Sequence, residues 1–214
     1  MAQNPTLNLV RASIGFLMAF GTYYAARRRK TGAGRARTEF PALAARLGLA
    51  HRPPADSRGI GSLRGTYEGH EVFVDPDDRP RVVVYLRGEP QILFRSFIVE
   101  KRTPANWVRI ESGDSWLDGY LKDRYASTDA ARALRPHHPE LAVKIRRIVD
   151  GHLAQNPQLS VTAERIECAL DFGKPAHLPA DAVERLLPDL EELAELLEEA
   201  AGARPEMTSS EASP

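Results

Sequence analysis

The apolar stretch Leu9–Ala26, near the start of the chain, most constrains what this sequence can form. As an α-helix its eighteen residues would be about 27 Å long, close to the ~30 Å thickness of a bilayer's hydrocarbon core. Four basic residues follow it at once: Arg27, Arg28, Arg29 and Lys30. Such a basic flank is typical of the cytoplasmic end of a membrane-spanning helix, where it contacts lipid headgroups. We therefore predict a single-pass membrane anchor with membrane lipid as a partner.

Three alternatives to a spanning helix stay open. A cleaved signal peptide normally carries its positive charge before the apolar segment, whereas here the charge follows it. An organellar presequence would fit the absence of acidic residues from residues 1–38, but such presequences are amphipathic rather than continuously apolar. An interfacial helix would use the narrow polar stripe that contains Asn8, Arg11 and Thr22. Length and flanking charge favour the spanning helix over all three.

Charge is distributed unevenly along the chain, although the net charge is zero. Residues 1–60 hold ten basic and two acidic side chains, whereas residues 179–214 hold two basic and ten acidic ones. Such asymmetry indicates that the two ends meet different partners or each other. Because the basic residues gather beside the apolar stretch and residues 61–178 are balanced, nucleic acid is not expected as a partner.

Residues 62–112 have the pattern of β-strands. Short stretches rich in β-branched and apolar residues alternate with turn-forming Gly, Pro and Asp; they are Ser62–Tyr67, Glu71–Asp75, Arg81–Leu86, Gln91–Val99 and Trp107–Ser112. Connections this short predict an antiparallel β-meander.

Helical spacing dominates the rest of the folded part. Helices are expected over Phe40–Leu49, after an N-cap at Asp114, from Ser127 or Thr128, and over Pro139–His152. A closing hairpin is expected from Leu159–Val161 and Ile166–Leu170. Strands followed by segregated helices predict an α+β fold, an antiparallel β-meander with packed helices after the N-terminal hydrophobic helix.

The chain is expected to divide into four parts. Residues 1–30 form the membrane anchor with its basic flank, and residues 31–37 form a flexible basic linker. Residues 38–202 form the α+β globular domain. Residues 203–214, rich in Ser, Glu and Pro, form a disordered tail.

The last predicted helix, Pro179–Ala201, has a leucine-rich stripe and an almost entirely acidic polar face. A stripe of this kind is expected to pack on the sheet. The near-heptad spacing of Val183, Leu190 and Leu197 favours the alternative, in which the helix pairs with a protein partner or a second copy. Pro188 is expected to kink the helix or restart it.

One segment resembles a known pattern. The pair Gly113-Asp114 is followed by Leu117 and Leu121, which bracket a second acid, Asp118. This arrangement resembles one in uncharacterised bacterial membrane-anchored proteins that carry a domain of unknown function. Asp at an N-cap and Gly in the preceding turn also have a sufficient structural reason here.

The resemblance extends over about residues 9–200. A segment like Asp129–Leu134, then a helix, and then a short hairpin like Leu159–Leu170 follow in that family. The chain departs from the family pattern at Leu117 and Leu121, where Phe is expected. The resemblance implies an N-terminal hydrophobic helix and a cytoplasmic α+β domain at the bacterial inner membrane, and it implies no chemistry.

Motifs that would assign a reaction are missing from the sequence. None of the six histidines belongs to an HExxH motif, and no GxSxG nucleophile motif is present. The single cysteine, Cys168, excludes an internal disulfide and a cysteine-built zinc site, and its place in a predicted strand suggests a core residue. We therefore predict no catalytic residues, no cofactor and no metal site.

These observations favour a non-catalytic binding or scaffolding module with a cytoplasmic domain, although the sequence leaves enzyme or non-enzyme uncertain. The C-terminal acidic and Leu-rich helix is the expected surface for a protein partner. The alternative is a membrane-tethered enzyme or small-ligand sensor with its site in a sheet–helix cleft. An enzyme would show convergent polar groups with perturbed pKa values in a pocket. A scaffold would show a shallow surface with an apolar patch.

Overall fold

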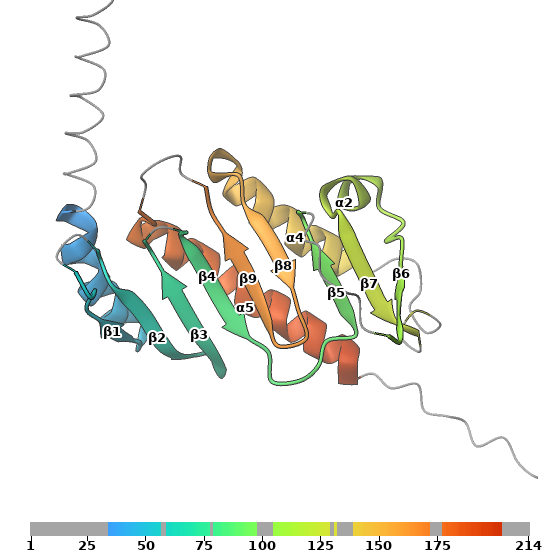
Figure 1. The fold of residues 1–214 in the computed structure, drawn as a ribbon, viewed down its shortest axis with the longest axis horizontal. Helices are drawn as coiled ribbons and strands as arrows, with labels where there is room; N and C mark the ends of the chain where they lie inside the picture. The colour runs from blue at the N-terminus through green and yellow to red at the C-terminus, as the bar shows by residue number, and fades with distance from the viewer. Residues whose placement is uncertain are drawn as a thin grey trace, which may run out of the picture.

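The computed structural model describes residues 34–56, 59–77, 79–97, 105–128, 131, 139–171 and 177–202. This part of the chain is an α+β fold, in which an antiparallel sheet of nine strands is covered by helices on one face (Figure 1). Each strand pairs antiparallel with its neighbours in the order β1-β2-β3-β4-β9-β8-β5-β7-β6. The α+β prediction is therefore confirmed.

All nine strands are short. Their bounds are β1 (Ala50–Arg52), β2 (Ser62–Tyr67), β3 (His70–Asp75), β4 (Arg81–Tyr85), β5 (Ile92–Arg95), β6 (Trp107–Arg109), β7 (Asp123–Ser127), β8 (Gln158–Val161) and β9 (Arg165–Ala169). The expected turn between the second and third strands is a two-residue hairpin loop, in which Glu68 has φ 46° and Gly69 has φ 92°. Two positive φ angles match the right-handed twist of the flanking strands.

The helices come from four regions. A first helix covers residues 34–47 of the described part, so residues 34–37, which the sequence analysis assigned to a linker, are helical, and Ala36 among them is buried. The others are α2 (Ser115–Tyr120), α4 (Pro139–Gly151) and α5 (Ala180–Gly202), with a short 3₁₀ turn at Leu153–Gln155. The helix continues through Pro188 and does not restart there.

The predicted meander is right for β2, β3 and β4 and wrong beyond them. The next strand along the chain, β5, does not pair with β4, because the late hairpin β8–β9 lies between them. Strands β1 and β7 were not predicted at all. Ser127 ends β7, and Thr128, the other start expected for the next helix, is helical in the structure.

One face of the sheet and the leucine stripe of α5 form the core. Valine side chains of β3 and β4 lie in register with Ile166 and Cys168 of β9, and all are buried. Helix α5 packs on β4 with six fully or almost fully buried side chains: Val183, Leu186, Leu187, Leu190, Leu193 and Leu197. The leucine stripe is therefore occupied by the fold, and only the acidic face of α5 is open to a partner.

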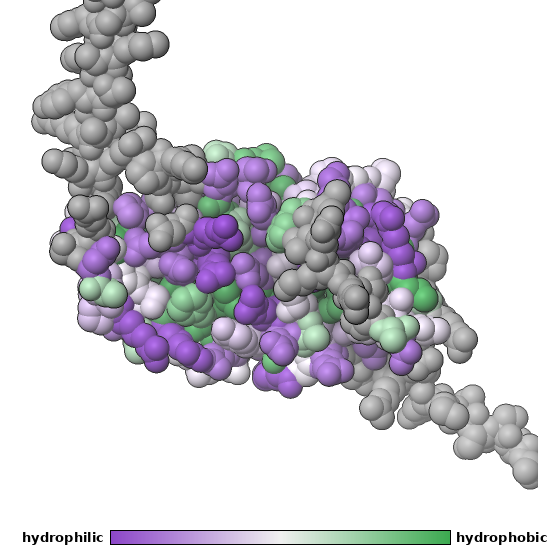
Figure 2. All heavy atoms as spheres, viewed as in Figure 1, coloured by the Kyte–Doolittle hydropathy of each residue, from purple (hydrophilic) through white to green (hydrophobic). Residues whose placement is uncertain are grey.

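The opposite face of the sheet carries charged side chains in cross-strand pairs. Arg81 of β4 lies 3.7 Å from Asp75 and 3.6 Å from Glu167, in neighbouring strands, and its guanidinium lies 6.0 Å from the centre of the Phe73 ring. Figure 2 shows this face as largely hydrophilic, with a hydrophobic area between the charged groups. Such pairing lets an antiparallel sheet face water on one side.

The acidic face of α5 is less solvated than the sequence suggests. Asp189 and Glu191 are buried, and Glu191 Oε1 lies 3.5 Å from Nδ1 of the fully buried His70. Glu198, two turns further on, lies 3.3 Å from His70 Nε2 and accepts hydrogen bonds from the backbone N–H (2.6 Å) and Nε (2.9 Å) of Arg87. These contacts attach α5 to the end of β3 and to the turn after β4.

The two carboxylates at His70 differ in pKa. Burial raises the pKa of Glu191, and the negative charge of Glu195 raises it further. Burial also acts to raise the pKa of Glu198, but the hydrogen bonds from Arg87 and His70 outweigh it and lower that pKa. A lowered folded-state pKa stabilises the fold above the unfolded pKa, and this stability is lost as pH falls through the folded value. A raised folded-state pKa, as at Glu191, instead destabilises the fold at pH values where the carboxylate is ionised.

Glu198→Gln should therefore lower the free energy of unfolding at pH 7 by about 1–3 kcal/mol, and the loss should shrink on acidification. Glu191→Gln, its matched control two turns away, should leave stability at pH 7 unchanged or raise it, because it removes a buried charge. Urea unfolding at pH 4 to 8 measures both. Equal losses at pH 7 would contradict this assignment.

The predicted anchor, including Arg27, Arg28, Arg29 and Lys30, lies outside the described residues, as does the predicted tail. Among the helices that the structure does describe, none combines the length and apolar character needed to cross a membrane.

Candidate functional site

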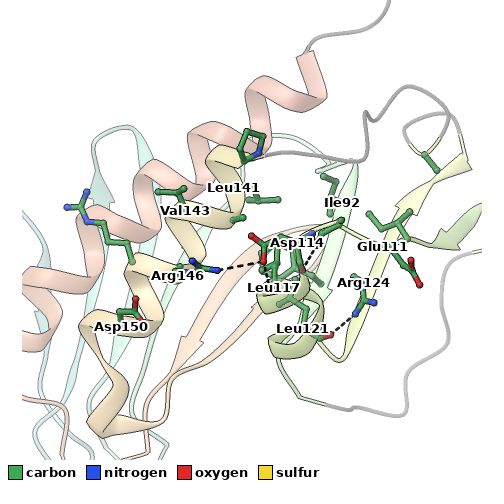
Figure 3. A pocket seen from close by; sticks show the side chains of 18 residues that line it. Ile92, Glu111, Asp114, Leu117, Leu121, Arg124, Leu141, Val143, Arg146 and Asp150 are labelled. Atoms are coloured by element: carbon green, nitrogen blue, oxygen red, sulfur yellow. Dashed lines mark hydrogen bonds and ion pairs between the residues drawn. The ribbon is translucent and has the colours of Figure 1, made fainter.

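A cleft of about 700 Å³ lies between α4, α2, the strands β5 and β7 and the segment that follows β6 (Figure 3). Its described lining is mainly aliphatic, with charged side chains among the apolar ones. The apolar members are Ile92, Phe94, Ile110, Leu117, Leu121, Ala131, Pro139, Leu141, Ala142 and Val143. The charged members are Glu111, Asp114, Arg124, Arg146, Arg147 and Asp150, and Ser112 and Gly113 complete the set. This is the sheet–helix cleft that the alternative reading of the sequence required.

Local sequence explains how α2 forms one wall. Gly113 has φ 78°, a conformation that favours glycine, and it turns the chain into the helix. Asp114 is the N-cap, as predicted, and its Oδ1 accepts the backbone N–H of Leu117 at 2.9 Å. The two leucines that bracket Asp118, Leu117 and Leu121, are buried and line the cleft.

Asp118 and Arg124 attach α2 to β7. Asp118 Oδ1 accepts hydrogen bonds from the backbone N–H (3.0 Å) and hydroxyl (2.9 Å) of Ser112, and it lies 2.9 Å from Arg124 Nε. Nη1 of the buried Arg124 donates to the carbonyl oxygens of Asp118 (3.1 Å) and Leu121 (2.8 Å). Burial would raise the pKa of Asp118, but the Ser112 hydrogen bonds and the Arg124 charge lower it overall.

Across the cleft, α4 contributes Arg146. Its guanidinium lies 4.6 Å from the centre of the Trp116 ring, and that ring stacks on Tyr120 with centroids 5.5 Å apart. One Nη of Arg146 lies 3.7 Å from Asp114 Oδ1, a contact that Figure 3 shows reaching across from α4 to α2. The stacked rings position the guanidinium over the cleft wall.

A smaller cavity of about 490 Å³ lies between α4 and α5. Its described lining combines Pro139, Val143 and Leu196 with four glutamates, Glu140, Glu192, Glu195 and Glu199. Lys144 forms an ion pair with Glu192 there, and burial lowers the pKa of Lys144.

The residues considered from sequence fall in different places. Cys168 is fully buried in β9, and burial raises the pKa of its thiol to about 12, so it is an inert core residue. A sheet–helix cleft was expected only in the enzyme or sensor alternative, and the residues that line it were not predicted. The segment Gly113–Leu121, which carries the family resemblance, was the one part of the cleft that the sequence analysis singled out, and it contains α2. Within the described residues, no group of His, Cys, Asp and Glu side chains has the arrangement of a metal site.

Comparisons with known proteins add little. The sequence matches no protein-family model and no curated protein. The crystal structure of the mycobacterial trehalose monomycolate transport factor A, TtfA, superposes with a TM-score of 0.43 and 10% identity, over 79% of this chain and 94% of that chain. A likeness this distant carries neither an architecture nor an activity over to this chain.

Asp118→Asn should lower the free energy of unfolding by about 1–3 kcal/mol, because the buried Arg124 loses its negative partner. The loss should be largest near neutral pH and smaller in acid, since the lowered pKa of Asp118 stabilises the fold only while the carboxylate is ionised. Glu164→Gln, at an exposed turn residue, is the control and should change stability by less than about 0.5 kcal/mol. Urea unfolding of both variants tests this, and equal effects would contradict it.

Proposed function

We propose that the described domain is a non-catalytic binding module that holds an apolar ligand in the cleft between α2 and α4 at a membrane. The observation that carries the proposal is the cleft itself. Its volume of about 700 Å³ lies within the range of small-molecule sites, roughly 300–1,000 Å³. Ten of its described lining residues are apolar, so the favourable free energy of binding would come mainly from burial of apolar surface.

The charged groups of the cleft support binding better than catalysis. Arg124 is engaged by Asp118 and two carbonyl oxygens, and Arg147 lies 3.0 Å from Asp189 of α5. Asp114 caps α2. Each of these groups holds elements of the fold together, whereas a general acid or base needs a side chain that is available to the substrate.

A second candidate is a membrane-tethered enzyme or small-ligand sensor that uses the same cleft. The approach of Arg146 to Asp114 across it favours this candidate, because a ligand that enters there meets both helices. Recovery of a bound ligand unchanged after incubation separates binding from turnover.

Location at a membrane rests on the apolar stretch Leu9–Ala26 and its basic flank. Only residues 31–33 separate Lys30 from the first helix of the domain, and three residues span at most about 10 Å. An anchored chain would therefore hold the domain close to the cytoplasmic surface of a bacterial inner membrane. A protein partner would meet the acidic face of α5, where Glu192, Glu195 and Glu199 line the smaller cavity.

Val143→Asp should abolish binding of an apolar fluorescent probe, because it places a charge on the cleft wall at a side chain that is already 67% exposed. Leu153→Asp is the matched control: Leu153 is 64% exposed, lies outside the described lining, and should leave binding unchanged. Fluorescence titration of both variants, with circular dichroism to verify folding, measures the difference. Equal binding by the two variants would refute the cleft as the site.

The anchor is tested by extracting membranes with alkaline carbonate. We expect the full-length chain to stay in the pellet at uncleaved mass. A chain that begins at Thr31, which keeps the whole first helix, should be released. Release of the full-length chain would mean that its apolar stretch does not span the membrane.

A further inference from the structure

We infer that the ligand of the cleft is a single acyl chain with an anionic head group, and that Arg146 binds the head. This inference rests on the proposed function, since it names the chemical class of the ligand for the same site. Two features carry it: the chemistry of the apolar wall and the way the charges around it are already paired.

The apolar wall suits a hydrocarbon chain. Helix α4 contributes Leu141, Ala142 and Val143, and α2 contributes Leu117 and Leu121. Strand β5 adds Ile92 and Phe94 and the segment after β6 adds Ile110, so that Phe94 is the one aromatic side chain in the described lining. The uncharged polar side chain there, Ser112, already donates its hydroxyl to Asp118 and accepts the backbone N–H of Asp114 at 3.1 Å. A ligand buried against this wall finds no uncharged side chain to hydrogen-bond, which favours an alkyl chain over a sugar or a nucleobase.

Two of the three arginines are closely paired within the protein. Arg124 is buried with Asp118 at 2.9 Å, and Arg147 is paired with Asp189 at 3.0 Å. Arg146 has a longer contact, 3.7 Å to Asp114 Oδ1, and that oxygen already accepts the capping hydrogen bond from Leu117. The guanidinium of Arg146 therefore keeps donors that a carboxylate or phosphate oxygen of a ligand can accept.

Two exposed carboxylates, those of Asp150 and Glu111, also line the cleft. Asp150 lies one turn after Arg146 on α4, and Glu111 follows Ile110 at the strand end of the cleft. Figure 3 shows Arg146 directed towards α2 and the Glu111 carboxylate directed away from the cleft. Asp150 should therefore weaken an anion at Arg146, whereas Glu111 should have little effect. Replacement of Asp150 should therefore tighten the binding of an anionic ligand, whereas replacement of Glu111 should not.

The test compares head groups on one chain length. The full-length chain is held in a fluorinated surfactant, which mixes poorly with hydrocarbon, and titrated calorimetrically with dodecanoate, dodecanol and dodecyltrimethylammonium. We expect dodecanoate to bind about five- to tenfold more tightly than dodecanol, and the cation to bind most weakly. Shortening the carboxylate should weaken binding by up to about fourfold per methylene group. A lauroyl lysophosphatidylglycerol arm shows whether the head group comes from a membrane lipid or a free fatty acid.

Variants that weaken dodecanoate binding and variants that tighten it together test whether Arg146 binds the head group. Arg146→Gln should reduce dodecanoate affinity to that of dodecanol, leaving dodecanol unchanged, and Arg146→Lys should restore part of the difference. Asp150→Asn should tighten dodecanoate binding about two- to threefold, and Glu111→Gln is its matched control. With Trp107→Phe, Trp116 is the sole tryptophan. A nitroxide near the head of a labelled fatty acid should then quench its fluorescence more than a nitroxide at the tail.

The outcomes distinguish failure of the anionic head group from failure of the cleft as a binding site. Equal affinity for dodecanoate and dodecanol, with no effect of Arg146→Gln, refutes the anionic head but leaves the cleft as an apolar site. Tighter binding of the cation, or stronger quenching by the tail nitroxide, also refutes it. If no amphiphile binds and the Val143→Asp variant behaves like the parent chain, the proposed function fails as well.

Discussion

The need to cover one face of a wide sheet governs this structure. Nine strands at about 4.8 Å spacing make a sheet about 38 Å wide, and its inner face is apolar from Leu63 to Phe94. Helix α5, with 23 residues, is about 35 Å long and carries leucines on one side throughout. It crosses the sheet obliquely (Figure 1) and packs on β4 and α4, so the leucine stripe has no surface left for a partner. Polar contacts to the buried His70 and the more exposed Arg87 then fix where the helix lies.

The cleft is a consequence of the same constraint. Strands β7 and β6 lie at the far end of the sheet, where the short helix α2 and the helix α4 provide the cover. Helix α2 has only six residues, too few to be stable alone, so it depends on its N-cap and on the Asp118–Arg124 pair. These polar groups fix α2 at its ends, and its two buried leucines line the cleft. The same ion pair thus holds one wall of the cleft in place.

Local features were predictable from the sequence, and the order of the strands was not. The Glu68-Gly69 turn, the N-cap at Asp114, the β8–β9 hairpin and the α4 and α5 helices depend on neighbours a few residues apart. Insertion of β8–β9 between β4 and β5 joins residues more than sixty positions apart, which periodicity does not encode. Strand β7 was missed because Arg124, buried by its pairing with Asp118, breaks the apolar alternation that identifies a strand.

The cleft was unpredictable for the same reason, with one exception. Its described walls come from three separate segments, around Ile92, from Ile110 to Arg124, and from Pro139 to Asp150, together with Ala131, and no spacing within any one segment indicates a cavity. The exception is the Gly113–Leu121 segment, in which Asp114 already had a sufficient structural reason as an N-cap. In the structure both of its acids are structural: Asp114 caps the helix and Asp118 pairs with a buried arginine. Because the fold uses both carboxylates, the charge of Arg146 becomes significant. Asp118 neutralises Arg124 closely, whereas Asp114 neutralises Arg146 only at a distance. Binding specificity here would follow from which charges the fold has already used.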